Sequence, residues 1–305
     1  MRRIGEPGWL QYENGNHRYR GAPPWFPSPA TPRALPSCSR SGLRSILLTP
    51  WQSFSVELSH WQDAGRAVEF WWRDDDATRP AVALTRLTTL AVQAQVPLGL
   101  AVIPDGADPA LFADLGAGIA VLQHGGDHRN RAADGEKATE FPATEPGESA
   151  LRRIAMGRAR LQALAGARLL PVLVPPWNRI PTTLVPRLAG LGFRGYSTFA
   201  PRLSTQPVDG VRQVNTHVDL IAWRRGRGFV GEERALAEAV EHLAARRTGA
   251  VDATEPTGWL THHACHDEAL WSFLARLFEE TRDRAGVRWL SPADAFSLDE
   301  TGIRT

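Results

Sequence analysis

From about residue 49 onward, the apolar positions of the chain follow two alternating patterns. Stretches with an apolar residue at every third or fourth position predict amphipathic helices, and short continuous apolar runs predict buried strands. We expect helices at 50–65, 79–95, 108–118, 148–166, 181–192, 232–247 and 267–286. We expect strands at 67–72, 96–104, 119–124, 167–176, 193–198, 211–220, 257–263 and 287–290.

This alternation of strand and helix is typical of a mainly parallel sheet, because each parallel connection needs a crossover segment, usually a helix. About seven or eight strands in one chain of 305 residues favour a closed (β/α) barrel over an open sheet. The predicted class is therefore α/β, with a parallel barrel as its architecture.

The first 45 residues differ in kind from the rest of the chain. They are crowded with Pro, Ser, Gly and Arg, and they lack any sustained period of two or of 3.6. We expect residues 1–45 to form a disordered or peripheral extension and residues 46–305 to form the barrel domain. A wrongly assigned start codon would leave the same signature, whereas Glu6, Glu13 and the many prolines disfavour an organellar transit peptide.

Composition narrows the possible function classes. An apolar content of 43% is ordinary for a soluble protein, and a net charge of +2 with scattered arginines offers no basic platform for nucleic acid. Cys38 and Cys265 match no CxxC spacing and form no disulfide framework, which fits a reducing compartment. The sequence has neither an apolar run long enough to span a membrane nor the apolar segment of a secretory signal, so we expect a cytoplasmic protein.

Residues suited to chemistry follow several of the predicted strands. These residues are Asp74–Asp76, His124, Pro176–Trp177 and His262–His263. In a parallel barrel the carboxyl ends of the strands converge on one face, where active sites form. The sequence therefore predicts that four strand ends supply functional groups to one mouth.

His124 and His128 lie four residues apart in the segment HGGDH. On a helical turn this spacing places both imidazoles on the same side, where they can bind one cation. Alone, such a pair is more often two surface histidines, but a triple aspartate at a neighbouring strand end reverses the balance. Two histidines and one carboxylate are a common catalytic zinc set that leaves one position open for water.

The three aspartates, Asp74, Asp75 and Asp76, directly follow an apolar aromatic run. One alternative is a capping role at the next helix, which Asp76 or Thr78 could fill. That role is compatible with one carboxylate of the three. Burial beside an aromatic strand makes unpaired carboxylates costly, so we expect Arg73 or a metal to compensate their charge.

The segment LTHHACHDE offers three further histidines, His262, His263 and His266. It is compatible with a polar strand end followed by a helix that Asp267 caps, or with a second metal site that includes Cys265. A strand followed by a turn fixes no ligand geometry, so a general acid at the strand end is the better supported interpretation.

Together these motifs resemble the polysaccharide deacetylases of carbohydrate esterase family 4. The shared features are an Asp pair after the first strand, HxxxH, a Pro–aromatic loop and a late LxH, in this order, between about Val68 and Trp289. The resemblance implies a distorted (β/α) barrel with about seven parallel strands and a divalent metal, usually Zn²⁺. It also implies hydrolysis of an N-acetyl group on an amino sugar, with an N-acetylated glycan as the substrate.

By this resemblance, the first aspartate of the pair is the catalytic base and the second is a metal ligand. Related divergent members read Arg, any residue, Asp, Asp, which matches Arg73 to Asp76. Asp75 is then the base, Asp76 the ligand and Asp74 a supporting residue. The other register, with Asp74 as base and Asp75 as ligand, stays open.

The later motifs carry over in the same way. His124 and His128 match the two metal histidines. The late LxH gives Leu260 as an apolar pocket residue and His262 as the catalytic acid, with the adjacent His263 as its rival.

Two aromatic segments complete the resemblance. Pro176 and Trp177 form a proline-stiffened loop whose indole can offer a flat face to a sugar ring. The resemblance also implies that the backbone N–H of Trp177 stabilises an oxyanion. Asp219 and Trp223 loosely match a segment that helps to orient the other catalytic groups.

Two positions depart from the family pattern. Val174 stands where an arginine usually steers the catalytic aspartate, and Asn178 stands where a glycine usually follows the aromatic residue. Arg73 or Arg179 could supply the missing charge. The departures leave two alternatives, a catalytically silent carbohydrate-binding barrel that keeps its metal cluster and an amidase on a non-sugar substrate. The sequence carries no signal for an oligomeric state.

Overall fold

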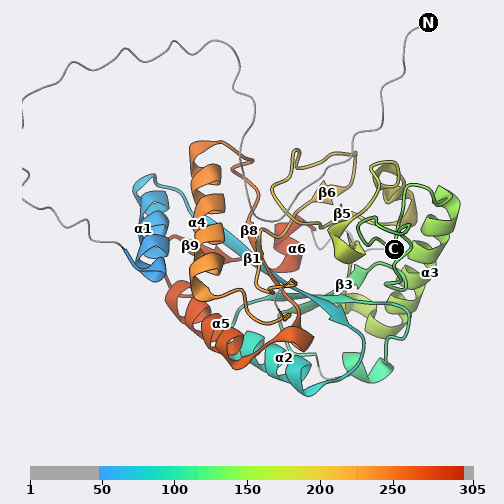
Figure 1. The fold of residues 1–305 in the computed structure, drawn as a ribbon, viewed down its shortest axis with the longest axis horizontal. Coiled ribbons are helices and arrows are strands. Elements are labelled where there is room, and N and C mark those ends of the chain that lie inside the picture. The colour runs from blue at the N-terminus through green and yellow to red at the C-terminus, as the bar shows by residue number, and fades with distance from the viewer. Residues whose placement is uncertain (1–47, 114, 225, 299–305) are drawn as a thin grey trace, which may run out of the picture. The chain divides into compact units, whose positions relative to one another are not determined.

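The structure is a computed structural model of the 305-residue chain and describes residues 48–113, 115–224 and 226–298. The predicted extension at 1–45 lies outside the described residues. The described part is a parallel β-sheet curled into a barrel and surrounded by helices (Figure 1). No helix within it combines the length and the apolar character that crossing a membrane requires.

Within the described residues the sheet contains nine strands, and neighbouring strands pair in parallel. Their order is β6-β5-β4-β3-β2-β1-β8-β7, and β9 pairs with the first residues of β1. The strands are β1 (Val68–Ala77), β2 (Leu98–Val102), β3 (Ile119–His124), β4 (Leu169–Val174), β5 (Gly195–Tyr196), β6 (Arg212–Gln213), β7 (Val218–Asp219), β8 (Thr257–Thr261) and β9 (Val287–Trp289).

The segment 212–219 closes this sheet into a barrel. Its first part, β6, pairs with β5, and its last part, β7, pairs with β8. Between them, the Val214 N–H donates to the Tyr196 carbonyl at 3.2 Å and the His217 N–H donates to the Gly258 carbonyl at 2.7 Å. β6 and β7 therefore occupy one strand position, and with β1 to β5 and β8 they make seven. The predicted distorted barrel of about seven parallel strands is confirmed.

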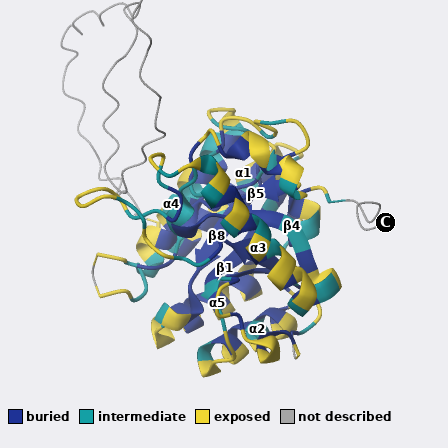
Figure 2. Cartoon of the chain, turned by 90° about the vertical axis from the view of Figure 1, so that its right-hand side faces the viewer, coloured by how far each residue is buried: buried dark blue, intermediate teal, exposed yellow. Residues whose placement is uncertain are grey.

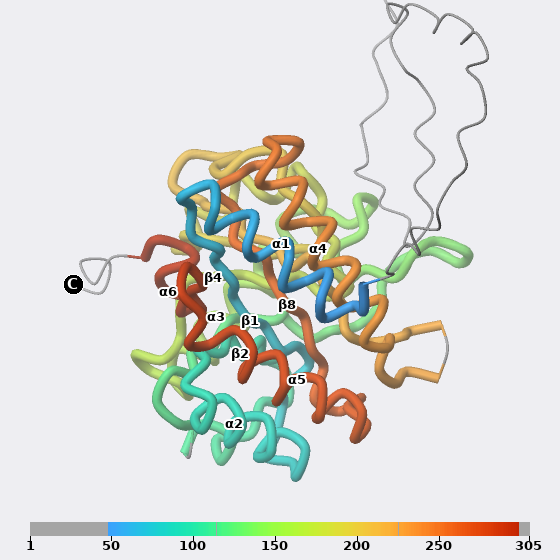
Figure 3. The backbone as a smooth tube through the Cα atoms, turned by 90° about the vertical axis from the view of Figure 1, so that its left-hand side faces the viewer, coloured from blue at the N-terminus to red at the C-terminus, as the bar shows by residue number. Residues whose placement is uncertain are grey.

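Helices form the outer layer. They are α1 (Pro50–Asp63), α2 (Val82–Ala94), α3 (Gly147–Ala165), α4 (Glu232–Thr248), α5 (Glu268–Thr281) and α6 (Pro292–Ala295). α1 and α4 lie side by side on one flank of the barrel (Figure 3). Most strand residues and the inward faces of the helices are buried, while the outer helix faces and loop tips are exposed (Figure 2). Five of these helices were predicted from the apolar spacing; α6 was not.

Aromatic side chains fill the layer between the strands and helices α1 and α5. Phe54 stacks on Phe70 with ring centroids 6.2 Å apart, and Phe70 meets Trp259 at 6.0 Å. Trp71, the next residue of β1, belongs to a separate buried cluster and donates from its indole N–H to the Asn215 carbonyl at 2.9 Å. Both faces of β1 are therefore packed, which fixes the strand whose carboxyl end carries the three aspartates.

Two predicted helices are wrong in kind. The expected helix at 181–192 consists of two short 3₁₀ turns, η4 (Val185–Arg187) and η5 (Ala189–Leu191). Pro186 lies in this segment, and a proline inside an α-helix removes a hydrogen bond and clashes with the preceding turn. The expected helix at 108–118 is reduced to the 3₁₀ turn η1 (Pro109–Phe112). The other 3₁₀ turns are η2 (Gly166–Arg168), η3 (Pro176–Asn178) and η6 (His263–Cys265).

Candidate active site

The three aspartates belong to the last part of β1. This strand continues to Ala77 and does not end at residue 72 as predicted. The pairing register between β1 and β2 shifts between Asp74 and Ala77, so the aspartates lie in an irregular strand end. Each of the three carboxylates has a different partner, which resolves how three neighbouring negative charges are tolerated there.

Asp76 is the aspartate that meets the two histidines. Its backbone φ is 71°, a left-handed conformation that Asp tolerates better than most residues. Its Oδ1 lies 3.0 Å from His124 Nε2 and 3.1 Å from His128 Nε2. The structure thus brings together the three residues that the sequence selected as metal ligands, with ligand atoms all within 4.8 Å of one another.

The tautomer of His124 follows from its other ring nitrogen. Nδ1 lies 3.0 Å from the Val174 carbonyl oxygen, which can only accept, so Nδ1 carries a proton. In a neutral ring, the Nε2 lone pair then faces a carboxylate oxygen of Asp76, so a proton or a cation must lie between them. Burial lowers the pKa of His124, but the charges of Asp75 and Asp76 outweigh it and raise that pKa above its ordinary value. Burial raises the pKa of Asp76, yet its histidine partners hold it well below the ordinary value.

This donor set fits a divalent cation. Two imidazole nitrogens and one carboxylate oxygen are typical zinc ligands, and the bond from His124 Nδ1 to a backbone carbonyl is the usual device that orients a metal-binding histidine. The His124 side chain is buried, whereas those of Asp76 and His128 are 37% and 23% exposed. One side of the cluster is therefore accessible from solvent.

The segment between the two histidines is a loop and not the helical turn that the spacing suggested. Gly125 and His128 both have positive φ values, 59° and 54°. A Cβ at Gly125 would lie 2.6 Å from the Pro176 ring, so this position has no room for a side chain. The loop folds back, and the two imidazole centroids lie 5.0 Å apart.

Arg73 binds Asp75. Both side chains are buried, and they pair through two hydrogen bonds, Nε to Oδ1 at 2.8 Å and Nη2 to Oδ2 at 3.0 Å. The remaining guanidinium donors bind Ser197 Oγ at 2.6 Å and Asn178 Oδ1 at 2.7 Å. Arg179, the other candidate for this charge, donates to a backbone carbonyl elsewhere. Asn178, noted in the sequence only as a departure, thus helps to hold the arginine.

Asp74 binds His263. Its Oδ1 lies 2.6 Å from His263 Nδ1, and its Oδ2 accepts from the Thr261 hydroxyl at 2.7 Å. Burial raises the pKa of Asp74, but His263 outweighs it and holds that pKa below its ordinary value. Burial lowers the pKa of His263, but Asp74 raises it above its ordinary value. The alternative capping role is wrong, because α2 begins after Ala81 without a side-chain cap.

His262 has a different set of neighbours from His263. Its ring meets that of Trp223 edge to face, with centroids 4.6 Å apart. The Trp223 indole N–H donates to Asp219 Oδ2 at 2.8 Å, so these three residues form one connected unit. Burial raises the pKa of Asp219 above its ordinary value. The Nδ1 of His262 is buried and has no hydrogen-bond partner among the described residues.

Two further predicted site residues, Trp177 and Leu260, differ in their relation to the site. Trp177, whose φ is 54°, places its ring 4.4 Å from that of His128. Leu260 has no exposed surface and pairs in register with Arg73 on one side and Asp219 on the other. It therefore lies behind the site and does not line its surface.

The histidines and the cysteine of 262–266 do not gather into a second metal site within the described residues. His263 binds Asp74, whereas His266 packs against Trp271 with ring centroids 4.3 Å apart. Asp267 accepts a hydrogen bond from the backbone of α5, which confirms its predicted role as a helix cap.

Sequence reasoning missed several residues that hold the site together. Ser197 binds Arg73, Thr261 binds Asp74, and Glu140 binds the backbone between the two histidines. Ser and Thr at strand ends carry no distinguishing pattern. Glu140 lies in a polar connection without helical or strand periodicity, so no local signal separates it from a surface glutamate.

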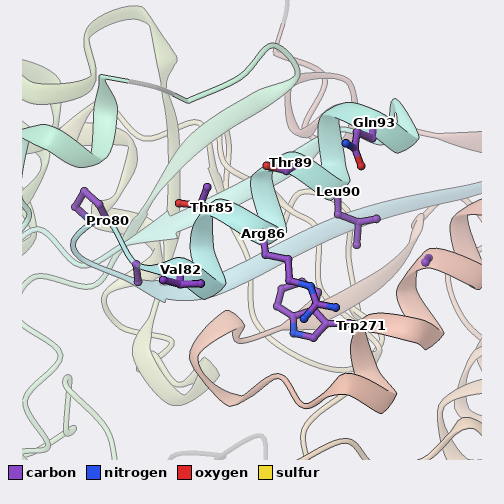
Figure 4. A pocket seen from close by; sticks show the side chains of 10 residues that line it. Pro80, Val82, Thr85, Arg86, Thr89, Leu90, Gln93 and Trp271 are labelled. Carbon is purple, nitrogen blue, oxygen red and sulfur yellow. The ribbon is translucent and has the colours of Figure 1, made fainter.

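A surface cavity of about 770 Å³ lies away from these residues, between α2 and α5 (Figure 4). Arg86 lies over the ring of Trp271, 4.6 Å from its centroid, and pairs with Glu268. The residues that line this cavity include none of the candidate catalytic side chains. Its aromatic face is already covered by the arginine, so the strand ends remain the candidate active site.

Comparison with known proteins places this arrangement in a fold. A protein assigned as a polysaccharide deacetylase from Mycobacterium smegmatis superposes with a TM-score of 0.50, covering 76% of this chain and 90% of that one at 17% identity. The chain has the polysaccharide deacetylase fold. The fold predicted from the motifs is therefore confirmed.

Other solved structures with the polysaccharide deacetylase fold are similarly distant in sequence. A peptidoglycan N-acetylglucosamine deacetylase is 14% identical, with a TM-score of 0.49 over 79% of this chain and 98% of that one. A carbohydrate esterase family 4 enzyme from Streptococcus mutans is 12% identical, with a TM-score of 0.49 over 75% and 87%. No protein-family model matches the chain, and no curated protein sequence matches it.

Proposed function

We propose that the chain is a metal-dependent hydrolase that removes N-acetyl groups from the amino sugars of a glycan. The observation that carries this proposal is the convergence of a metal-type triad with an arginine-bound carboxylate on one strand end. Asp76 Oδ1 lies within 3.1 Å of both histidines of the triad, and Asp75, the preceding residue, is held by Arg73. The polysaccharide deacetylase fold, common to this chain and to the protein from Mycobacterium smegmatis, supports the same assignment.

Asp76, His124 and His128 would hold the cation, and Zn²⁺ is the ion that this donor set favours. When bound, a divalent cation supplies Lewis acidity, which polarises an acyl carbonyl and makes water easier to deprotonate. The fixed Nδ1–H of His124 keeps its Nε2 available for this purpose.

Asp75 is the proposed general base. Its two oxygens each accept one hydrogen bond from Arg73, which fixes the plane of the carboxylate and leaves a lone pair on each oxygen. The charge of Asp75 acts on the proposed ligand His124, and this proximity supports a role in which Asp75 takes a proton from a water molecule that attacks the acetyl carbonyl.

His262 is the proposed general acid, which donates a proton to the departing amine nitrogen. Asp219, which is half-buried, is close enough for the charge of His262 to act on its pKa, and Trp223 contacts both groups. His263 is a weaker candidate, because its Nδ1 is already committed to Asp74 at 2.6 Å. Separate residues for base and acid suit the opposite protonation states that the two roles need at one pH.

Two tryptophans favour a sugar as the substrate. Trp177 lies beside the ligand His128, and Trp223, which is 40% exposed, lies beside the proposed acid His262. Indole rings beside His128 and beside His262 are suited to contact the apolar faces of sugar rings. The backbone N–H of Trp177, in its left-handed turn, is the proposed donor to the oxyanion that forms from the acetyl carbonyl.

The case for a catalytically silent barrel is weaker in the structure than in the sequence. Its support was the valine at position 174, where related enzymes carry a steering arginine. Arg73 supplies a guanidinium to Asp75 from within β1, so the charge has a source despite Val174. An amidase that acts on a non-sugar substrate would use the same catalytic groups. Only a comparison of substrates distinguishes it from a glycan deacetylase.

The test is acetate release from purified full-length protein. The substrates are N-acetylated glycan oligomers, with N-acetyl-lysine peptides as the non-sugar arm. We expect release from the glycans, loss of activity after chelation and recovery with Zn²⁺. Asp76→Ala should lose both bound metal and activity, whereas Asp105→Ala, an exposed carboxylate at position 105, should retain both. Full activity of metal-free Asp76→Ala would refute the proposal, and release from the peptides alone would establish the non-sugar amidase.

A further inference from the structure

The carboxylate of Glu140 collects three consecutive backbone N–H groups of the loop between the metal-type histidines. Oε1 accepts from Gly126 at 2.9 Å and from Asp127 at 3.3 Å, and Oε2 accepts from His128 at 3.0 Å. Glu140 has no exposed surface. A loop whose successive N–H groups point at one spot forms an anion-binding concavity, and here a side chain of the same chain fills it.

The loop is packed onto this carboxylate without spare room. A Cβ at Gly125 would lie 2.2 Å from Glu140 Oε2. A Cβ at Gly126 would lie 3.0 Å from Glu140 Oε1 and 2.7 Å from Arg153 Cγ. The two glycines of HGGDH are therefore needed for the close approach of Glu140 as well as for the turn after the strand.

The same loop is also held from its carbonyl side. Gln123 Nε2 donates to the Gly125 carbonyl at 2.8 Å and to the Ile154 carbonyl of α3 at 2.8 Å. Donors and acceptors of the loop backbone are thus tied to buried groups, which is how a short segment keeps positive φ at both Gly125 and His128.

A buried carboxylate needs compensation for the loss of water. Arg153 Nε donates to Glu140 Oε1 at 3.1 Å, and the same guanidinium forks onto Glu145 at 2.8 and 2.9 Å. Arg153 therefore pairs with two carboxylates. The three loop N–H groups are the other hydrogen-bond donors that stabilise the buried charge of Glu140. Glu145 touches the arginine and not the loop.

We propose that Glu140 is a positioning residue for the metal centre. It fixes the backbone of the HGGDH loop so that the Nε2 atoms of His124 and His128 converge on Asp76 before a cation arrives. The inference rests on the proposed function to the extent that the triad binds metal. Without Glu140, no hydrogen bond would hold the His128 N–H while this residue keeps its left-handed backbone conformation. The His128 ring could then move away from the His124 ring.

The variant that tests this is Glu140→Gln. Glutamine keeps the size of the side chain. Both carboxylate oxygens of Glu140 accept from backbone N–H groups, so in either orientation the amide NH₂ of glutamine would meet a donor instead of an acceptor. Metal-free full-length protein is titrated with Zn²⁺ against a chromophoric chelator. Loss of a residue that orients metal ligands typically weakens metal affinity about 10- to 100-fold, and we expect a loss in this range. The visible spectrum of Co²⁺-loaded protein should change as well, because it reports the ligand geometry.

Glu145→Gln is the matched control. It removes a carboxylate from the same arginine but none from the loop, so it should keep the wild-type Zn²⁺ affinity and Co²⁺ spectrum. Wild-type affinity and spectrum in Glu140→Gln, together with loss of metal in Asp76→Ala, would overturn the positioning role while the metal centre stands. Wild-type affinity in Asp76→Ala would overturn both, because metal would then bind elsewhere.

Hydrogen exchange in metal-free wild-type protein covers the case in which Glu140→Gln does not fold. The amides of Gly126, Asp127 and His128 donate to a buried carboxylate, so we expect them to exchange slowly without any metal. Exchange at the rate of an open loop would show that Glu140 does not organise the segment, and would overturn the inference.

Discussion

Arg73 and Asp75 lie two residues apart on β1 and form a two-point ion pair in which neither side chain is accessible to more than a trace of solvent. Alternate residues of a strand share a face, so the pair is a direct consequence of the RDDD sequence. The guanidinium also reaches Ser197 and Asn178, which follow other strands of the barrel. One arginine therefore ties the proposed base to two further strand ends.

Arg73→Lys should lower kcat about 10²-fold with little change in KM. Lysine keeps the charge but is a point donor, and it cannot form the planar fork that orients Asp75. A misplacement of about 1 Å in a reacting group can cost a factor of this size. Steady-state acetate release from the best glycan substrate measures the effect.

Arg86→Lys is the control for this substitution, because Arg86 forms an exposed ion pair with Glu268 away from the site. It should leave kcat and thermal stability close to wild type. If Arg73→Lys turns over at the wild-type rate, Arg73 does not orient the proposed base. Val174 would then again leave Asp75 without the arginine that related enzymes use.

The two registers of the aspartate run can be separated by paired substitutions. Asp75→Asn should retain Zn²⁺ binding and lose turnover by about 10²- to 10⁴-fold, the usual contribution of a general base. Asp74→Asn should act mainly on stability, because it leaves the buried His263 without its charged partner. Loss of one member of a buried ion pair typically costs about 3–5 kcal/mol.

Three measurements are needed for each variant: Zn²⁺ affinity, kcat and the free energy of unfolding. The other register, with Asp74 as base and Asp75 as ligand, makes the opposite forecast. In that case Asp75→Asn loses its metal and Asp74→Asn keeps its metal but not its turnover. That result would reassign both residues.

Much of the site was predictable because strand ends in a parallel barrel converge. The run 119–124 was predicted with the observed bounds of β3, since six residues without a helical pattern end at a polar histidine. The segment 211–220 was predicted as one strand, and it does close the barrel as one strand position, although it contains the two short strands β6 and β7. Apolar runs mark such elements because the strands of a barrel are buried on both faces.

The remainder depended on conformations and contacts that local patterns do not encode. Asp76 turns toward the histidines through a left-handed φ inside a strand, whereas strand alternation alone would have placed it with Asp74. His124 and His128 converge through a loop and not through helical spacing. Glu140 acts on that loop from outside the motif, so its role is visible only in three dimensions.

His262 and His263 should differ in what their replacement costs. If His262 is the general acid, His262→Asn should lower kcat about 10²- to 10⁴-fold. His263→Gln should instead reduce the free energy of unfolding, because it removes the partner of the buried Asp74. Acetate release and urea unfolding of both variants measure the two effects. Wild-type turnover in His262→Asn together with lost turnover in a folded His263→Gln would exchange the two assignments.

A second group of two histidines and a glutamate lies elsewhere, where α4 packs against the barrel. It contains His217, His242 and Glu255, all buried, with the two rings stacked at 3.5 Å. The Gly258 N–H donates to His217 Nδ1 at 3.0 Å, so in the neutral ring Nε2 keeps its proton. Nε2 lies 3.3 Å from Glu255 Oε2 without forming a hydrogen bond to it, and because it carries the proton it has no lone pair to offer a metal. The group is therefore a poor cation site despite its composition.

Glu255 should instead impose a pH dependence on stability. Burial raises its pKa from an ordinary 4.5 to about 7, so between these values the folded chain holds a proton that the unfolded chain releases. The free energy of unfolding should therefore fall as pH rises through this window, by at most about 3 kcal/mol from the size of the shift. Burial lowers the pKa values of His217 and His242, which gives the opposite slope below pH 6.5. Glu255→Gln keeps the histidine contribution, so urea unfolding of both proteins from pH 4.5 to 8 isolates the glutamate. The variant should gain stability relative to wild type as pH rises, and parallel curves across the window would show that Glu255 does not carry the shifted proton.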